Sequence, residues 1–401
     1  MNETLNNIKE LIKQANCILI GAGSGLSTAS GIDYVGDEFK KEFAPFIKKY
    51  GFTDLYTSSF YEFGTQEEYW AYWAKHINFS NIGRKGTELY KKIYDLVKEK
   101  EYFVITTNWL LNRIKEGFVY VRNPYYKHQV TKYSLNPSAV DCLAFCTKNP
   151  HPLISHLSEL DKYKQFWFVT ITPYGKDIEP NVPDKKQVIS DFKKLSEHLG
   201  KNAVAIRYDP IFINEKFDVS MHIKCFERLL KELKEYTEDC TISFLDMYEK
   251  VKRNAPNLRP PTTEEQIEIA KAFSKIGKEN NITIHACCEK EYLKDYGLDI
   301  TGCMSQEIVE KAIQNKLNTP KNNSKRMQCN CLMGNDVGAY NSCMHLCKYC
   351  YANANQGLVK ENVKKHNPDS PFLIGDLEKE DKITEANQKS WLNSYNQISF
   401  V

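Results

Sequence analysis

The residues with the clearest capacity for chemistry are cysteines near the carboxyl-terminal end of the chain. Cys343, Cys347 and Cys350 follow a Cys-x3-Cys-x2-Cys spacing, and Cys329 and Cys331 precede them. Thiolates this close in sequence repel one another unless a cation holds them, and the glycine and asparagine residues between the two groups allow the chain to reverse. The spacing therefore predicts a metal centre on Cys343, Cys347 and Cys350.

Two kinds of metal centre suit these thiols, and free thiols are a third alternative. Structural zinc takes four ligands, usually from two Cys-x2-Cys pairs, and only Cys347 and Cys350 have that form. Three thiolates instead suit a [4Fe-4S] cluster in which one iron stays open to a small molecule. The favoured prediction is an iron–sulfur cluster, and a zinc-stapled ligand-binding protein is the alternative.

A second group of cysteines lies upstream. Cys287 ends an apolar run and Cys303 begins a later loop, and both precede Cys329 and Cys331. We expect these four thiols to form an auxiliary metal site. The alternative is that Cys287 is a buried small hydrophobe.

The segment from Cys343 to Cys350 resembles the motif of the radical S-adenosylmethionine superfamily, because Tyr349 occupies the aromatic position before the last cysteine. The resemblance implies a [4Fe-4S] cluster, S-adenosylmethionine on its open iron, Tyr349 near the adenine, and a surrounding six-unit partial barrel. Here the motif follows the sixth predicted strand instead of the first, and no Gly-Gly-Glu segment follows the second strand. The barrel is therefore either circularly permuted or only convergent with that superfamily.

The elements that must position these residues alternate from residue 103 onward. Short β-branched or aromatic runs are separated by helical segments, among them 184–199, 218–236 and 262–280. Such alternation predicts an α/β fold with a parallel sheet, and a six-unit partial barrel of the TIM type suits it best. The expected strands are 103–108, 140–150, 166–175, 203–210, 240–248 and 282–289, and 119–124 is expected to form a side hairpin.

Polar residues follow the predicted strands, at the edge of a parallel sheet where ligands bind. Arg207 and Asp209 alternate onto one face of their strand, where they could hold a carboxylate or hydroxyl of a substrate. Arg122 follows the side hairpin strand. We expect these three residues to orient a small-molecule substrate at the catalytic site.

Residues 109–395 resemble a bacterial family called domain of unknown function 1848. The phrases that carry the resemblance include NRIKEGFVYVRNP, CTKNP, TPYGKDIEPNVP, RYDPIF, GAYNSCMHLCKYCYAN and HNPDSPFLIG. That family has no assigned activity, so the resemblance implies ancestry more than a reaction.

The first third contains a glycine-rich loop after an apolar run. Gly21, Ala22, Gly23 and Ser27 belong to GAGSGLSTASG, whose backbone amides could approach a pyrophosphate at the start of a helix. With Asn108 after a later strand, residues 1–108 resemble the amino-terminal part of macrodomain-linked sirtuins, which implies a Rossmann-like segment that binds NAD.

The sirtuin pattern stops after Asn108. A sirtuin would continue with an aliphatic-Asp pair and a catalytic histidine, whereas this chain continues with Trp109, Leu110 and Leu111. The segment at 103–108 would also have to serve both the sirtuin sheet and the barrel. We therefore expect a gene fusion in which the sirtuin-like part is truncated and residual NAD binding is an alternative function.

Three domains are expected: a truncated sirtuin-like segment at 1–102, the α/β partial barrel at 103–320, and a Cys-rich iron–sulfur segment at 321–401. A formal net charge of +3 is too small to indicate a polyanion partner, although protein and nucleic-acid substrates remain open. No apolar stretch is long enough to span a membrane, and the cysteines favour a reducing compartment, so a cytoplasmic protein is expected.

Overall fold

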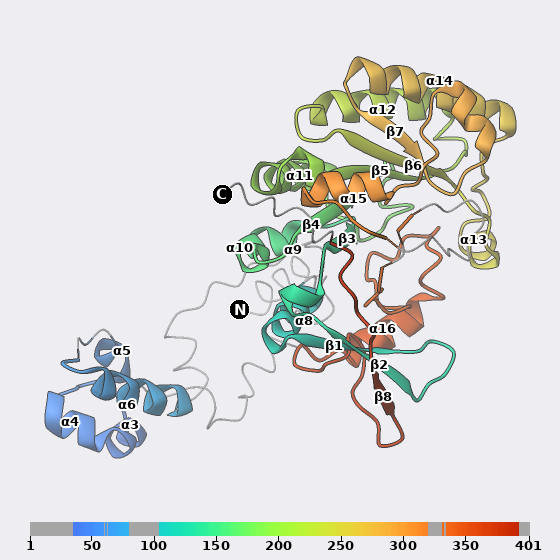
Figure 1. Ribbon diagram of the computed structural model, residues 1–401. Helices are drawn as coiled ribbons and strands as arrows, with labels where there is room; N and C mark the ends of the chain where they lie inside the picture. The colour runs from blue at the N-terminus through green and yellow to red at the C-terminus, as the bar shows by residue number, and fades with distance from the viewer. Residues whose placement is uncertain are drawn as a thin grey trace, which may run out of the picture. The chain divides into compact units, whose positions relative to one another are not determined.

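The chain folds into two compact units, Met1–Tyr102 and Phe103–Val401. The computed structural model describes residues 35–59, 61, 63–79, 104–319, 331–332 and 334–392 (Figure 1). Among these residues, no helix is long and apolar enough to cross a membrane.

The described part of the first unit is helical and packs on aromatic side chains. Phe43 and Tyr72 are fully buried, and their ring centroids lie 6.0 Å apart. The side chain of Thr65 caps the start of α6 (Gln66–Ile77) by accepting a hydrogen bond from the Glu68 backbone N–H. The predicted glycine-rich loop at 21–32 lies outside the described residues. The helices are α3 (Asp37–Glu42), α4 (Ala44–Tyr50), α5 (Leu55–Ser58) and α6 (Gln66–Ile77).

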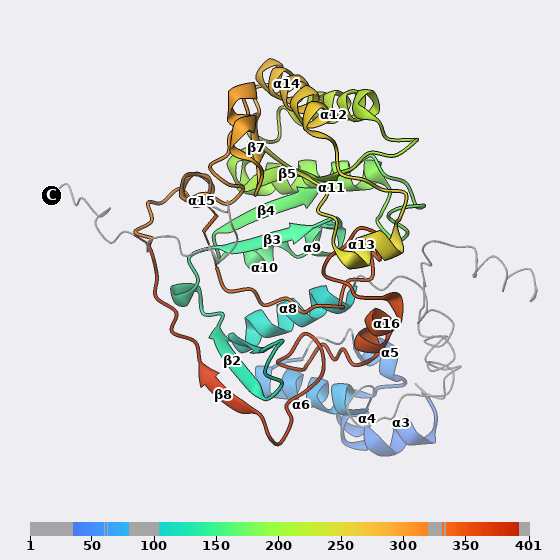
Figure 2. The ribbon, with the colours of Figure 1, turned by 90° about the vertical axis from the view of Figure 1, so that its right-hand side faces the viewer.

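The second unit contains a parallel five-stranded sheet, in the order β3-β4-β5-β6-β7. The spatial order follows the sequence order without a reversal, and Figure 2 shows β3, β4 and β5 side by side. The predicted mixed α/β fold with a parallel sheet is therefore confirmed. The strands are β3 (Leu143–Thr147), β4 (Gln165–Thr170), β5 (Val204–Ile211), β6 (Asp239–Phe244) and β7 (Thr283–Ala286).

The predicted first strand at 103–108 is wrong, because helix α8 (Val104–Glu116) occupies this segment. The β-branched residues of VITT favour a strand locally, but they run directly into WLLNRIKE, whose apolar residues recur at helical spacing. Trp109, Leu111 and Ile114 are buried in the main core, so packing of this helix overrides the local preference.

A second, three-stranded sheet has the order β1-β2-β8. The expected side hairpin forms from β1 (Phe118–Arg122) and β2 (Gln129–Ser134), which pair antiparallel. β8 (Lys382–Glu385) adds to β2 in parallel, so the end of the described chain returns to the start of this unit.

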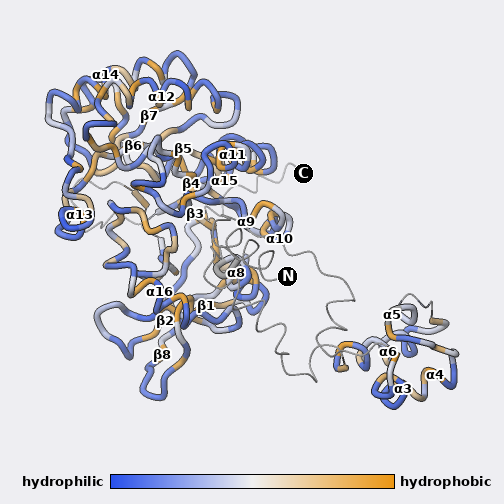
Figure 3. The backbone as a smooth tube through the Cα atoms, turned by 180° about the vertical axis from the view of Figure 1, so that it is seen from behind, coloured by the Kyte–Doolittle hydropathy of each residue, from blue (hydrophilic) through white to orange (hydrophobic). Residues whose placement is uncertain are grey.

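Amphipathic helices cover the parallel sheet, and in Figure 3 hydrophobic and hydrophilic stretches alternate along α12 and α14. Phe226 on α12 stacks on Phe273 on α14 with ring centroids 3.6 Å apart. A capping box of Thr262 and Glu265 begins α14. The α-helices that follow β3 along the chain are α9 (His151–Ile154), α10 (Leu157–Leu160), α11 (Lys185–Leu199), α12 (Val219–Leu233), α13 (Glu249–Asn254), α14 (Thr263–Glu279), α15 (Gln306–Ile313) and α16 (Gln356–Lys364). The 3-10 helices are η2 (Pro137–Ala139), η3 (Lys201–Ala203) and η4 (Glu291–Tyr296).

Side chains of β4 alternate between two apolar clusters, as the period of a strand requires. Trp167 and Val169 join the main core, whereas Phe166 and Phe168 join a separate cluster that contains three cysteines. The sheet is therefore buried on both faces, and the second face carries the thiols described next.

Candidate metal centres

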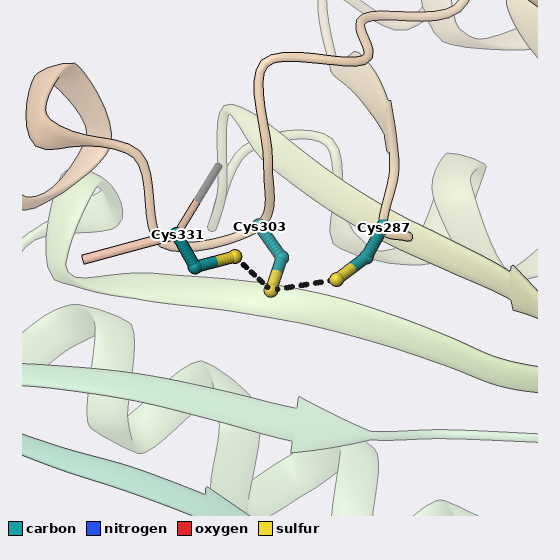
Figure 4. A group of neighbouring side chains, drawn as sticks. All are labelled: Cys287, Cys303 and Cys331. Carbon is teal, nitrogen blue, oxygen red and sulfur yellow. Dashed lines mark hydrogen bonds between the residues drawn. The ribbon is translucent and has the colours of Figure 1, made fainter. Parts of the chain in front are cut away.

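Three buried cysteines meet at the carboxyl-terminal end of the sheet (Figure 4). The Sγ atoms of Cys287 and Cys303 lie 3.1 Å apart, and those of Cys303 and Cys331 lie 3.3 Å apart. All three sulfur atoms lie within 4.8 Å of one another, which is close enough to hold one metal ion. The structure thus brings together three of the four thiols predicted for the auxiliary site, and Cys329 lies outside the described residues.

Apolar side chains surround these thiols, and Arg207 lies near enough for its charge to act on them. Phe166, Phe168 and Ile308 pack in the same cluster. The hydrogen bond with Cys303 is the largest influence that holds the pKa of Cys287 far below its ordinary value, and the charge of Arg207 lowers it further.

The cysteines of the Cys-x3-Cys-x2-Cys motif lie on a loop outside helices and strands. Cys343 is exposed, and Cys347 and Cys350 are half-buried. Burial raises the pKa of Cys347 most, and the charges of Cys343 and Cys350 raise it further, so the three thiols are neighbours. Within the described part of the chain, however, their sulfur atoms are not all within 4.8 Å of one another, unlike those of the first group.

Tyr349 anchors this loop to the ends of the parallel strands. Its ring lies 6.0 Å from that of Tyr174, after β4, and 6.3 Å from that of Phe212, after β5. The backbone of Lys348 donates a hydrogen bond to the Ile178 carbonyl at 3.0 Å. The motif therefore lies at the carboxyl ends of the strands, where ligands bind in parallel α/β folds.

A buried carboxylate beneath this loop was not identified from the sequence. Glu179 accepts hydrogen bonds from the hydroxyls of Tyr349 and Thr172, and its oxygens lie 2.9 Å from Lys148 Nζ and 2.5 Å from Lys185 Nζ. Burial raises its pKa, but the two lysines outweigh burial and lower the pKa to about 2. TPYGKDIEPNVP contains this glutamate, and its position between prolines after a strand was the available signal.

The predicted substrate pair is formed. Arg207 Nε donates a hydrogen bond to Asp209 Oδ2 at 2.6 Å, and the guanidinium carbon lies 5.7 Å from the centroid of the Phe168 ring. Glu289, after β7, accepts a hydrogen bond from the Phe244 backbone at 2.7 Å, and burial raises its pKa to about 7. Arg207, Asp209 and Glu289 therefore line the carboxyl ends of β5–β7, and Glu289 had not been identified from the sequence.

Arg122 lies elsewhere, at the end of β1 in the small sheet. Both of its terminal nitrogens pair with the carboxylate of Asp381, and its guanidinium carbon lies 4.8 Å from the centroid of the Phe372 ring. This arrangement ties the hairpin to the returning chain, so the structure gives Arg122 a structural contact and does not bring it to Arg207.

The residues predicted to bind NAD are not assembled within the described chain. Gly21, Ala22, Gly23 and Ser27 lie outside the described residues. Asn108 lies exposed on helix α8 of the second unit, because the strand that was expected to end at this residue is a helix.

The fold and the cysteine groups define the class of protein: a mixed α/β protein with a parallel sheet and a buried cysteine group that could bind a metal. The model of the family described as Domain of unknown function (DUF1848) matches residues 103–352, and the chain belongs to this family.

Two curated relatives have a different description. The chain is 36% identical over 101 residues to a protein ADP-ribosyltransferase of Staphylococcus aureus, which covers 25% of this chain and 32% of that protein. It is 29% identical over 147 residues to a probable bifunctional ADP-ribose hydrolase/ADP-ribosyltransferase of Fusarium oxysporum f. sp. cubense, which covers 36% of this chain and 23% of that protein. The matched stretches therefore span a third or less of the relatives' length.

Proposed function

We propose that the chain is an iron–sulfur enzyme in which Cys343, Cys347 and Cys350 hold a [4Fe-4S] cluster. The carrying observation is the position of their loop, which Tyr349 fixes at the carboxyl ends of β4 and β5. The consecutive order of β3 to β7 supports a partial barrel around this site, since a doubly wound sheet would reverse its strand order.

The donor set suits a cluster. A [4Fe-4S] cluster is held by cysteine thiolates, and the motif supplies three of them while leaving one iron open. Burial raises the pKa of Cys347 to about 12 and Lys148 opposes this rise, so a bound metal would itself stabilise the thiolate that it requires. A bound cluster supplies single electrons to a ligand on its open iron, and the resemblance implies S-adenosylmethionine as that ligand.

The chain's own residues bind and orient the substrate. Arg207 uses Nε to bond Asp209, and its terminal nitrogens suit a carboxylate or phosphate of a small molecule. Glu289 has a pKa of about 7, so it can hold or accept a proton near neutral pH. The proposed substrate is therefore a small, polar, anionic molecule, and the proposed compartment is the cytoplasm, where thiols stay reduced.

Anaerobic reconstitution with iron and sulfide tests the proposal through visible and EPR spectra. The full chain should show a [4Fe-4S] signal after reduction. Cys347→Ser should lose it, whereas Cys225→Ser, which changes a half-buried thiol on α12, should keep it. Tight zinc binding without a cubane spectrum would contradict the proposal.

A second candidate function is nucleotide binding by the Met1–Tyr102 unit. The names of the two relatives favour it. NAD should then raise the unfolding temperature of the full chain, because a ligand that binds only the folded state stabilises it. An unchanged unfolding temperature at millimolar NAD would contradict this function.

A further inference from the structure

We propose that Cys287, Cys303 and Cys331 bind a single soft divalent ion, zinc, in a site separate from the cluster on Cys343, Cys347 and Cys350. The inference goes beyond the proposed function and does not depend on it. The fourth ligand of the ion comes from outside this group.

The spacing of the sulfur atoms favours one ion. Tetrahedral zinc with Zn–S bonds of about 2.3 Å places neighbouring sulfurs about 3.8 Å apart. The sulfurs here lie 3.1 and 3.3 Å from the central Cys303, and all are within 4.8 Å of one another. A small outward movement of each thiol produces the zinc geometry. A cubane would require larger movements, and the distances are too long for a disulfide.

The surroundings require a positive charge beside any thiolates in this group. Phe166, Phe168, Ala205 and Ile308 pack around the group, and an apolar pocket penalises unpaired thiolates. Arg207, whose guanidinium carbon lies 5.7 Å from the centroid of the Phe168 ring, is already paired with Asp209. A divalent ion supplies the missing positive charge. Thiolates are the ligands that zinc accepts in such closed sites.

A backbone N–H orients the sulfur of Cys331. The Met304 backbone N–H donates to Cys331 Sγ at 3.5 Å, which is a typical orienting contact for a metal-bound sulfur. Cys287 directly follows β7, and Cys303 precedes α15. An ion at this point would therefore join the end of the sheet to both segments that flank α15.

Cobalt binding tests the site without any assay of activity. The full chain with Cys343, Cys347 and Cys350 all replaced by serine isolates this group from the proposed cluster. After metal removal, this variant should bind one equivalent of Co²⁺ with thiolate charge-transfer bands and the intense visible bands of a tetrahedral site. Binding of no Co²⁺, or a six-coordinate spectrum, would overturn the inference.

Two further substitutions in that background identify the ligands. Cys303→Ser should weaken Co²⁺ binding by more than about tenfold. Losing a residue that only hydrogen-bonds to a metal ligand already costs about that much, and Cys303 would be a ligand itself. Cys288→Ser is the matched control: its sulfur lies 3.9 Å from that of Cys287 but is not in the group. It should retain affinity. Equal losses in both variants would overturn the assignment.

The unsubstituted chain provides a measurement that does not depend on folding of the variants. Loaded with zinc, it should protect Cys287, Cys303 and Cys331 from alkylation, as mapped by mass spectrometry, and a strong chelator should expose all three. Reactivity that the chelator leaves unchanged would refute the site. If the triple-serine variant binds cobalt but the unsubstituted chain shows no iron–sulfur spectrum, only the proposed function is rejected. If the unsubstituted chain shows the iron–sulfur spectrum but the variant binds no cobalt, only this inference is rejected.

Discussion

Replacing Glu179 by glutamine should destabilise the chain strongly. The carboxylate is 1% exposed and pairs with Lys148 and Lys185, so an amide would leave two ammonium groups beside it without their counter-charge. Its pKa is lowered from 4.5 to about 2, which corresponds to roughly 3 kcal/mol. This agrees with the roughly 3–5 kcal/mol lost when a buried ion pair is broken.

Urea unfolding followed by tryptophan fluorescence measures this loss. Because the folded pKa of Glu179 is lowered, its contribution is complete above the unfolded value of 4.5 and is lost as the pH falls towards about 2. The difference between the natural chain and Glu179→Gln should therefore shrink across this window.

Glu249→Gln is the control for the same chemical change. Glu249 pairs with Lys252 at 2.7 Å, but both side chains are more than half exposed, so no measurable change is expected. Equal effects of the two substitutions, or a Glu179 effect that is independent of pH, would refute the reasoning.

Three further substitutions test the fold by urea or thermal unfolding. Arg122→Lys keeps the charge but loses the two-pronged contact with Asp381, and should cost about 1.5–3 kcal/mol; an unchanged midpoint would show that this contact adds nothing. Phe226→Ala removes a fully buried ring stacked on Phe273 and should lower the free energy of unfolding by about 3–5 kcal/mol. A loss below about 1 kcal/mol would contradict this packing role. Thr262→Ala removes the cap of α14 and should cost about 1 kcal/mol, whereas a stabilised chain would contradict the capping role.

The sequence predicted the parallel strands because their apolar runs are buried on both faces, as in β4 with Phe166 and Trp167 on opposite sides. The prediction of a strand at 103–108 was wrong, because the β-branched residues there begin helix α8. Local preference and packing disagree at this point, and the burial of Trp109 that decides the outcome depends on distant parts of the chain.

The density of cysteines predicted one site on Cys287, Cys303, Cys329 and Cys331, and the structure groups Cys287, Cys303 and Cys331, whereas Cys329 lies outside the described residues. Glu179 was missed because a single glutamate between prolines in a loop is a weak signal, and its lysine partners come from two other segments. Arg122 was assigned to the substrate site because an arginine before Asn-Pro has the same appearance after any strand, whichever sheet the strand joins.

Native mass spectrometry of the anaerobically purified full chain tests the central claim most directly. The account predicts a mass increase that corresponds to one [4Fe-4S] cluster, which Cys343→Ser removes while the folded charge-state distribution persists. A chain that carries only zinc, or iron that survives Cys343→Ser unchanged, would contradict the cluster on Cys343, Cys347 and Cys350.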